Sequence, residues 1–235
     1  MKRVAAFDAS TWWGGVALVE SDGESGCNLI AEWGLHVTDS HAAHLLQGLE
    51  HLLQQAGWER GTLDAFAAAR GPGAFTGVRV ALGTVRGLAL AAGRACVGVD
   101  TLQALAEASG PAEADRVPLL DAGRGEVYGA RYDAAGSPPV ELRAPWLGPP
   151  EQVLEQGAGG GAVLIGPGAE LTGTTLARVG WSGTFRRLPT SVAAGVGRIA
   201  LSRLAQGDTG EDGMSPLYLR PPDAVLKAPS QPRGG

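Results

Sequence analysis

The sequence has few cysteines and few charges, and both shortages narrow the function classes. Its two cysteines, Cys27 and Cys96, lack the spacing of metal ligands and do not suggest a disulfide framework. Charged residues make up only 18% of the 235 residues, and the net charge of −5 provides no basic footprint for nucleic acid across the whole surface. These features argue against a protein that binds RNA by itself, although not against one subunit of an RNA-modifying assembly.

Signal peptides, membrane spans and common catalytic motifs are missing as well. Only residues 4–7 form an apolar stretch at the N-terminus before Asp8 interrupts it, which is too short for a signal peptide. No apolar run reaches the length of a membrane span, and there is no nucleophile elbow, P-loop, HExxH motif or Rossmann fingerprint. We therefore expect a cytoplasmic protein without a membrane segment, built as one large domain or two small lobes.

Glycine, in contrast, is abundant, and its most informative use is the segment ARGPGAFTGVRVALGTVRGLAL at residues 69–90. The segment predicts a strand over residues 64–69, then a Gly-Pro-Gly turn and a helix over residues 74–92. A strand, a glycine-rich turn and a helix N-terminus together expose backbone N–H groups, which suit a phosphate or another anion.

The predicted helix carries almost no charge. Beyond its first turn only Arg79 and Arg86 are charged, and their spacing of seven residues places them on one face. Gly83, Gly87 and Ala91 recur at four-residue spacing and would let another helix or a sheet approach closely. The helix could lie on its own sheet alone. Because one sheet can hardly bury its whole circumference, we favour an outward face that contacts a partner.

A second helix is predicted over residues 40–56, with Ser40 or Asp39 as its N-cap. It carries His41 and His44, but two histidines without an evident carboxylate or third ligand do not indicate a metal site. An apolar stripe at helical spacing runs along this helix through Ala42, Leu45, Leu46, Leu49, Leu52, Leu53 and Ala56.

The two halves of the sequence open with the same plan. FDASTWWGGVAL and LLDAGRGEVYGA each predict an apolar strand, an Asp-Ala pair, a glycine-bearing turn and a returning strand. Asp8, Ser10 and Thr11 in the first turn, with Asp121 in the second, could hold a nucleotide; the alternative is an Asx-type turn that closes a hairpin. The remaining predictions are strands over residues 29–37, 95–99, 162–165 and 217–219, helices over 101–108 and 191–206, a Pro-rich connection over 137–150, a Gly-rich turn at 166–168 and a flexible loop over 157–161.

Four segments together resemble the TsaB family. They are FDAST at residues 7–11, the glycine-rich segment at residues 69–90, DAGRGEVYGARY at residues 121–132 and SPLYLR at residues 215–220. The Gly-Pro-Gly-x-Phe-Thr-Gly run with its arginine is the most specific of them. TsaB is the non-catalytic bacterial subunit of the machinery that makes N6-threonylcarbamoyladenosine (t6A) at position 37 of tRNAs. The resemblance thus implies a scaffold subunit with no catalytic residues of its own.

The family fold implies an α/β protein of two RNase H-like lobes, as in actin and the sugar kinases (the ASKHA fold). The N-terminal lobe would span residues 1–104 and the C-terminal lobe residues 105–220, followed by a disordered tail over residues 221–235. The helix over residues 191–206 is a candidate to pack on the N-terminal lobe. The nucleotide cleft between the lobes would then be vestigial.

The resemblance also implies partners, namely the catalytic paralogue TsaD, the ATPase TsaE and tRNA through the complex, with a homodimer through the same surface as an alternative. No intrinsic cofactor or metal is expected, although ATP or ADP at the complex interface stays open. In the family, the two helices of the N-terminal lobe form the interface. The corresponding residues here are His41, Leu45, Leu49, Phe75, Arg79, Gly83, Arg86 and Gly87.

One departure from the family bears on the second motif. The family commonly has Asp-Ala-Arg there, whereas this chain has Asp121, Ala122 and Gly123, with Arg124 one place later. The alternative function is a stand-alone enzyme, either an actin-like ATPase or kinase or an M22-type metalloprotease-like enzyme. Such an enzyme would need a metal or a catalytic acid–base pair.

Overall fold

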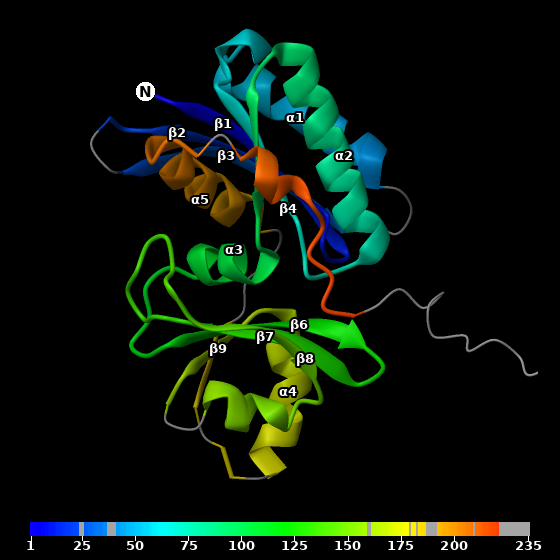
Figure 1. Ribbon diagram of the computed structural model, residues 1–235, viewed down its shortest axis with the longest axis vertical. Coiled ribbons are helices and arrows are strands. Elements are labelled where there is room, and N and C mark those ends of the chain that lie inside the picture. The colour runs from blue at the N-terminus through cyan, green and yellow to red at the C-terminus, as the bar shows by residue number, and fades with distance from the viewer. Residues whose placement is uncertain are drawn as a thin grey trace, which may run out of the picture.

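Two five-stranded sheets build the two lobes of the protein (Figure 1). The computed structural model describes residues 1–23, 26–36, 41–158, 161–178, 180–181, 183–186, 192–208 and 210–220, without the side chains at 41–43, 157–158 and 211–212. The first sheet contains β1 (Arg3–Asp8), β2 (Trp13–Ser21), β3 (Cys27–His36), β4 (Ala65–Ala69) and β5 (Ala95–Val99). The second contains β6 (Arg116–Gly123), β7 (Glu126–Tyr132), β8 (Glu141–Gly148), β9 (Val163–Ile165) and β10 (Thr184–Arg186).

Both sheets have the same topology. The first has the order β3-β2-β1-β4-β5, with β1 to β3 antiparallel and β4 and β5 parallel to β1. The second has the order β8-β7-β6-β9-β10, with the equivalent pairing at each step. The sequence Gly-Pro-Gly-Ala follows β4 at residues 71–74 and recurs after β9 at residues 166–169. The predicted internal repeat and the two-lobed α/β fold are therefore confirmed.

Helices cover both sheets and fill the space between them. α1 (His41–Ala56) and α2 (Phe75–Ala92) cover one face of the first sheet, and α5 (Ala193–Ala205) packs on its other face against β1 and β2. α3 (Thr101–Ala108) packs against α5 and also against β6 and β7, so it lies between the two sheets (Figure 1). α4 (Pro167–Arg178) packs mainly on β6, at the outer side of the second sheet.

β1, β2 and β4 of the first sheet are buried on both faces, which explains their nearly continuous apolar sequence, whereas the edge strand β3 is largely exposed. In β1, Val4 and Ala6 belong to the core shared with α3 and α5, whereas Ala5 and Phe7 belong to the core under α1 and α2. This alternation follows from the two-residue period of a strand. A third core lies between the second sheet and α4.

Several predicted elements need correction. The connection over residues 137–150 contains β8, which was missed because its prolines are tolerated only at a sheet edge, where β8 lies. The turn at residues 166–168 begins α4, with Pro167 at the first helical position, where proline is favoured. Residues 217–219 form no strand, and β10 was not predicted. A π-helical turn over Leu154–Ala158 includes the first two residues of the loop expected at 157–161, and the tail from residue 221 lies outside the described residues.

α2 also corrects the expectation that no apolar run reaches a membrane-spanning length. Its 18 residues, with a mean hydropathy of 1.2, are long and apolar enough to cross a membrane when only length and composition are considered. One such helix is weak evidence, because the core helix of a soluble protein satisfies the same test. In this fold α2 packs on β4 of the first sheet and buries one of its faces, comprising Gly77, Val78, Ala81, Leu82, Val85 and Ala89.

Candidate functional site

The Gly-Pro-Gly turn brings its bare backbone against other segments of the same chain. A Cβ atom added at Gly77 would lie 1.8 Å from the carbonyl oxygen of Ala9, and one at Gly73 would lie 2.4 Å from that of Ser10. The Ala74 amide, at the start of α2, donates a hydrogen bond to the Ser10 carbonyl at 2.7 Å. The glycines therefore serve close packing between the β1–β2 turn and α2, which explains them without an anion.

The two Asp turns have the same local geometry. The Ser10 amide donates to Oδ1 of Asp8 at 2.9 Å, and the Gly123 amide donates to Oδ1 of Asp121 at 2.7 Å. Both are Asx-type turns, which is the structural alternative considered for these residues. The hydroxyl of Thr11 stays within its own turn, where it exchanges hydrogen bonds with the backbone of Trp13.

The two aspartates differ in their surroundings. Asp8 is fully buried, its Oδ1 also accepts the Ser10 hydroxyl at 2.6 Å, and its Oδ2 accepts the Val192 amide at 3.3 Å, just before α5. Asp121 is exposed. Oδ1 of Asp8 thus closes its own turn and Oδ2 joins that turn to the start of α5, an arrangement that does not favour a role in positioning a metal or a water.

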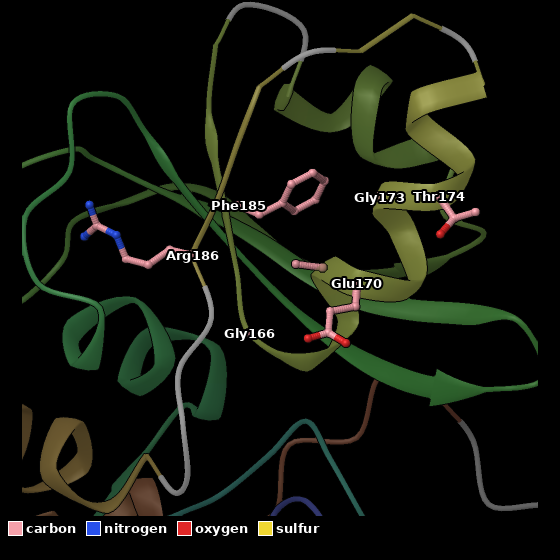
Figure 2. A pocket seen from close by; sticks show the side chains of 7 residues that line it. Gly166, Glu170, Gly173, Thr174, Phe185 and Arg186 are labelled. Atoms are coloured by element: carbon pink, nitrogen blue, oxygen red, sulfur yellow. The ribbon is translucent and has the colours of Figure 1, made fainter.

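A cavity of about 290 Å³ lies in the second lobe, between α4 and β10, and it includes none of the predicted site residues. The Phe185 ring packs over Gly173, where an added Cβ would lie 2.6 Å from the ring (Figure 2). Arg186 points away from that ring and donates to the carbonyl oxygens of Ser109 and Pro111 at 2.8 and 2.9 Å. With its arginine committed elsewhere and much of its wall formed by glycine, alanine and a phenyl ring, this cavity does not indicate catalysis.

Burial favours the neutral forms of two titratable groups, the half-buried thiol of Cys27 and the buried hydroxyl of Tyr132. Burial raises the pKa of the Cys27 thiol above its ordinary value, although Arg198 opposes this shift. Burial, with the charges of Asp100 and Glu141, raises the pKa of the Tyr132 hydroxyl far above its ordinary value. Neither group is poised as a nucleophile or a base. Among the residues that the structure describes, no three His, Cys, Asp or Glu side chains gather where they could hold a metal ion.

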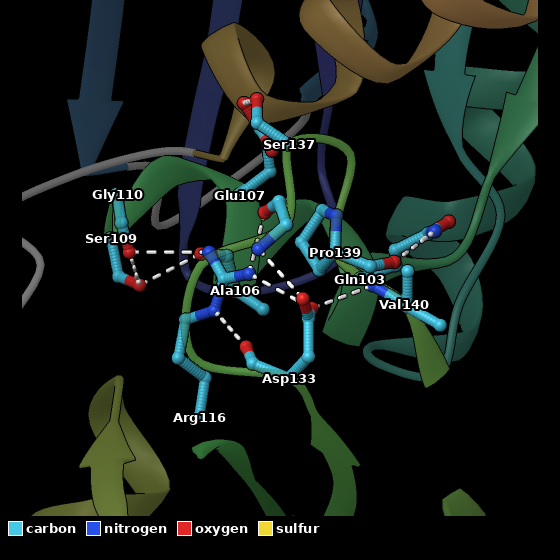
Figure 3. A network of polar contacts seen from close by, with 11 residues as sticks. Gln103, Ala106, Glu107, Ser109, Gly110, Arg116, Asp133, Ser137, Pro139 and Val140 are labelled. Carbon is cyan, nitrogen blue, oxygen red and sulfur yellow. Dashed lines mark hydrogen bonds and ion pairs between the residues drawn. The ribbon is translucent and has the colours of Figure 1, made fainter. Parts of the chain in front are cut away.

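A buried arginine fixes α3 to the second sheet, and no sequence pattern predicted this role. Arg116, only 1% exposed, donates to the carbonyl oxygens of Ala106, Gly110, Asp133 and Gly136 and to the carboxylate of Asp133 (Figure 3). Burial acts to raise the pKa of Asp133, but two backbone amides and the Arg116 guanidinium outweigh it and hold that pKa below its ordinary value. The network ties the C-terminal end of α3 to β6 and to the loop after β7.

The outward side of α2 is a broad surface of small and apolar residues, as the predicted interface requires. Gly83 and Gly87 are exposed, and a Cβ atom at either would meet no atom within 4 Å. Leu90 is 86% exposed and Phe75 43%, and Leu46 of the adjoining α1 is 45% exposed. We call these residues, with Arg79, Arg86 and Ala91, the helix face.

Two of the predicted interface residues do not lie on the helix face. Leu45 and Leu49 are 0% and 1% exposed and belong to the core between α1, α2 and the first sheet. The apolar stripe of α1 turns inward because the sheet beneath it offers the larger apolar surface. His41 begins α1, but its side chain lies outside the described part of the chain.

Arg79 and Arg86 both contact the C-terminal segment of their own chain. Arg79 donates through Nε to the Tyr218 hydroxyl at 2.7 Å, and its guanidinium lies 3.8 Å from the centre of the Phe75 ring. Arg86 donates to the carbonyl oxygen of Met214 at 3.2 Å. Tyr218 was missed as a site residue because these contacts join positions 139 residues apart.

A family model described as TsaD, tRNA N6-adenosine threonylcarbamoyltransferase, matches residues 36–161, more than half of the chain. The chain belongs to this family. Three of its curated relatives are named tRNA threonylcarbamoyladenosine biosynthesis protein TsaB. That of Escherichia coli K12 is 39% identical over 94 residues (39% of this chain and 41% of the relative), and that of Haemophilus influenzae is 34% identical over 125 residues (52% and 50%). The chain thus spans about half the length of these relatives.

A solved structure of Pseudomonas aeruginosa, described as an uncharacterized protein with similarity to peptidase YEAZ, superposes with a TM-score of 0.78 at 28% identity. It covers 94% of this chain and 100% of its own. The resemblance to the TsaB family is thereby confirmed. The departure from the family's second motif also has a local explanation, because Gly123 has a φ of 71°, a conformation that favours glycine over arginine.

Proposed function

We propose that this protein is a non-catalytic subunit of the tRNA t6A machinery and that its helix face binds the TsaD-type transferase subunit. The observation that carries the proposal is the exposed Gly83–Gly87 surface on an 18-residue helix, flanked by exposed Leu46, Phe75 and Leu90. Two glycines without neighbours allow a partner helix to approach closely, and the flanking side chains supply apolar area. The names of the TsaB relatives and the match to the TsaD family model support a role in the synthesis of t6A on tRNA.

Charge favours a different partner over a second copy of this chain. α2 contains two arginines and no acidic residue, so a second α2 would bring no carboxylate to them. Glu50 of α1 already pairs with Arg60 at 2.6 Å. A partner with carboxylates opposite Arg79 and Arg86 is therefore better matched than a homodimer.

A stand-alone ATPase, kinase or metalloprotease is the second candidate, and the buried state of Asp8 disfavours it. In the proposed function, any ATP or ADP is bound at the interface of the complex, where a TsaE-type ATPase and tRNA also dock, in the cytoplasm. Reconstituting tRNA modification from purified components, with and without this chain, tests the pathway directly. Undiminished t6A formation without the chain would remove the proposed role, and clear ATP turnover by the chain alone would favour the enzyme.

The partner surface is tested by titrating the purified protein with the TsaD-type transferase of the same organism. Gly87→Glu places a carboxylate in the middle of the helix face and is expected to weaken binding by more than about a hundredfold, since burying an unpaired charge costs about 3–5 kcal/mol. Ala177→Glu is the matched control, because it adds the same charge at an exposed position of α4 in the other lobe. Equal affinities of a folded Gly87→Glu variant and the control would place the interface elsewhere.

A further inference from the structure

The last described segment of the chain, residues 210–220, crosses from the first lobe to the second. We call it the C-terminal strap. At its start the backbone packs closely on β5, since a Cβ atom at Gly98 would lie 2.0 Å from the carbonyl oxygen of Gly213. Further along, the Leu217 amide donates to the Arg70 carbonyl at 2.7 Å, beside the Gly-Pro-Gly turn. A glycine at position 71 is required there, because its Cβ would lie 2.6 Å from the Leu217 carbonyl oxygen.

The strap ends on the Asp hairpin of the second lobe. Arg220 donates to the carbonyl oxygen of Ala122 at 2.7 Å and forms an ion pair with Glu126, at the turn between β6 and β7. This ion pair is partly shielded, with the Arg220 side chain 20% exposed. The strap is therefore attached to the first lobe at β5 and Arg70 and to the second lobe at the β6–β7 turn.

Between these two attachments the strap contributes one side chain to the helix face. The Tyr218 ring stacks on the Phe75 ring, with centroids 5.2 Å apart and planes 28° apart. The Arg79 guanidinium lies over Phe75 and is held by the Tyr218 hydroxyl. Phe75 and Tyr218 are still 43% and 38% exposed, so the three side chains form an ordered group that remains open to a partner.

We propose that Tyr218 is a positioning residue of the partner surface and that the strap makes the affinity of the helix face depend on the arrangement of the two lobes. The inference rests on the proposed function. Tyr218 limits the conformations of Phe75 and Arg79 before the partner arrives, so the entropy of ordering them is not lost on binding. Because Arg220 fixes the other end of the strap to the β6–β7 hairpin, a movement of that hairpin reaches Tyr218 through a single intervening residue, Leu219.

The test measures the dissociation constant of the TsaD-type transferase subunit for the full chain by calorimetry. Tyr218→Ala is expected to weaken binding by about tenfold, equal to about 1.4 kcal/mol. Tyr218→Phe retains the stacking but not the hydrogen bond and is expected to recover most of that affinity. In an Arg79→Ala background, Tyr218→Phe should cause no further change, because the hydroxyl acts through Arg79.

Arg220→Gln tests the connection to the second lobe, since the guanidinium of Arg220 donates to Ala122 and Glu126 of the β6–β7 hairpin. It is expected to weaken binding about threefold, whereas Arg143→Gln, at an exposed arginine of β8, should leave affinity unchanged. If the wild-type chain binds and Tyr218→Phe, Tyr218→Ala and Arg220→Gln all bind within twofold of it, the inference is overturned and the proposed function stands. If the wild-type chain itself does not bind the transferase, the proposed function fails as well.

Discussion

The same substitution at two glycines of α2 should change stability in opposite directions. Gly87 is exposed, and a Cβ atom there would meet nothing within 4 Å. Gly77 is buried at the start of the same helix, and its Cβ would lie 1.8 Å from the backbone oxygen of Ala9. Gly87→Ala and Gly77→Ala therefore add the same methyl group to the same helix, but only position 87 has space for it.

The magnitudes follow from helix propensity and packing. Alanine is favoured over glycine inside a helix by about 1 kcal/mol, so Gly87→Ala should stabilise the protein by nearly that amount. For a chain of this length, that gain corresponds to a rise in Tm of about 2–4 °C. At Gly77 the same methyl group must displace the β1–β2 turn, and overpacking of this kind costs about 1–3 kcal/mol, which exceeds the propensity gain near a helix start.

Thermal unfolding of both variants measures whether each substitution raises or lowers Tm. Calorimetry with the transferase subunit then measures how each variant binds the partner. Gly87→Ala should weaken partner binding while it stabilises the fold, since the added methyl group stands between the two helices. If Gly77→Ala were as stable as Gly87→Ala, the packing of the β1–β2 turn on α2 would be wrong. If Gly87→Ala bound the transferase as well as the wild type, close helix approach at that position would be refuted.

Three further predictions concern the polar groups. Asp8→Ala should destabilise the protein by about 2–3 kcal/mol in urea unfolding, because it leaves a buried amide without an acceptor. Asp121→Ala, at the exposed equivalent turn, should cost less than about 1 kcal/mol. Equal losses of unfolding free energy in the two variants would contradict the difference in burial. Arg116→Met should cost about 3–5 kcal/mol, since several buried carbonyl oxygens and a carboxylate lose their donor, and a loss below about 1 kcal/mol would show that water replaces the guanidinium. The pKa of Asp133 is lower in the folded protein than its ordinary 3.8, so the stability that this carboxylate contributes is present above pH 3.8 and is lost as the pH falls below it. Asp133→Asn should therefore flatten the dependence of the unfolding free energy on pH in this acid range. An unchanged slope would refute the lowered pKa of Asp133.

Much of the fold could be predicted because local signals agree with the tertiary structure. The segment at residues 69–90 combines strand, turn and helix signals, and the structure has β4, the turn and α2 in that order. The repeated Asp-Ala pattern correctly predicted two equivalent hairpins. Strand β8 escaped prediction because the rule that places proline at a sheet edge applies only once the order of the strands is known.

The candidate site was harder to predict, since it depends on which side of each helix meets the sheet. Periodicity grouped Leu45, Leu46 and Leu49 in one stripe, but only Leu46 reaches the surface. The same difficulty applies to glycines. Gly77 and Gly87 cannot be distinguished in the sequence, yet Gly77 is packed against the backbone of Ala9 and Gly87 has no atom within 4 Å of its Cβ position. The contact of Tyr218 with Arg79 could not be predicted at all, because no local pattern joins residues so far apart in the chain.

The position of α5 has a consequence for synthesis on the ribosome. β1 and β2 are made first, but the helix that covers their inner face begins only at residue 193. Until that helix leaves the exit tunnel, the nascent first sheet exposes Val4, Ala6 and Val19 to water or to chaperones. Translation through α5 must therefore precede completion of the first lobe, so the strands of the second lobe are synthesised before the first sheet is covered on both faces.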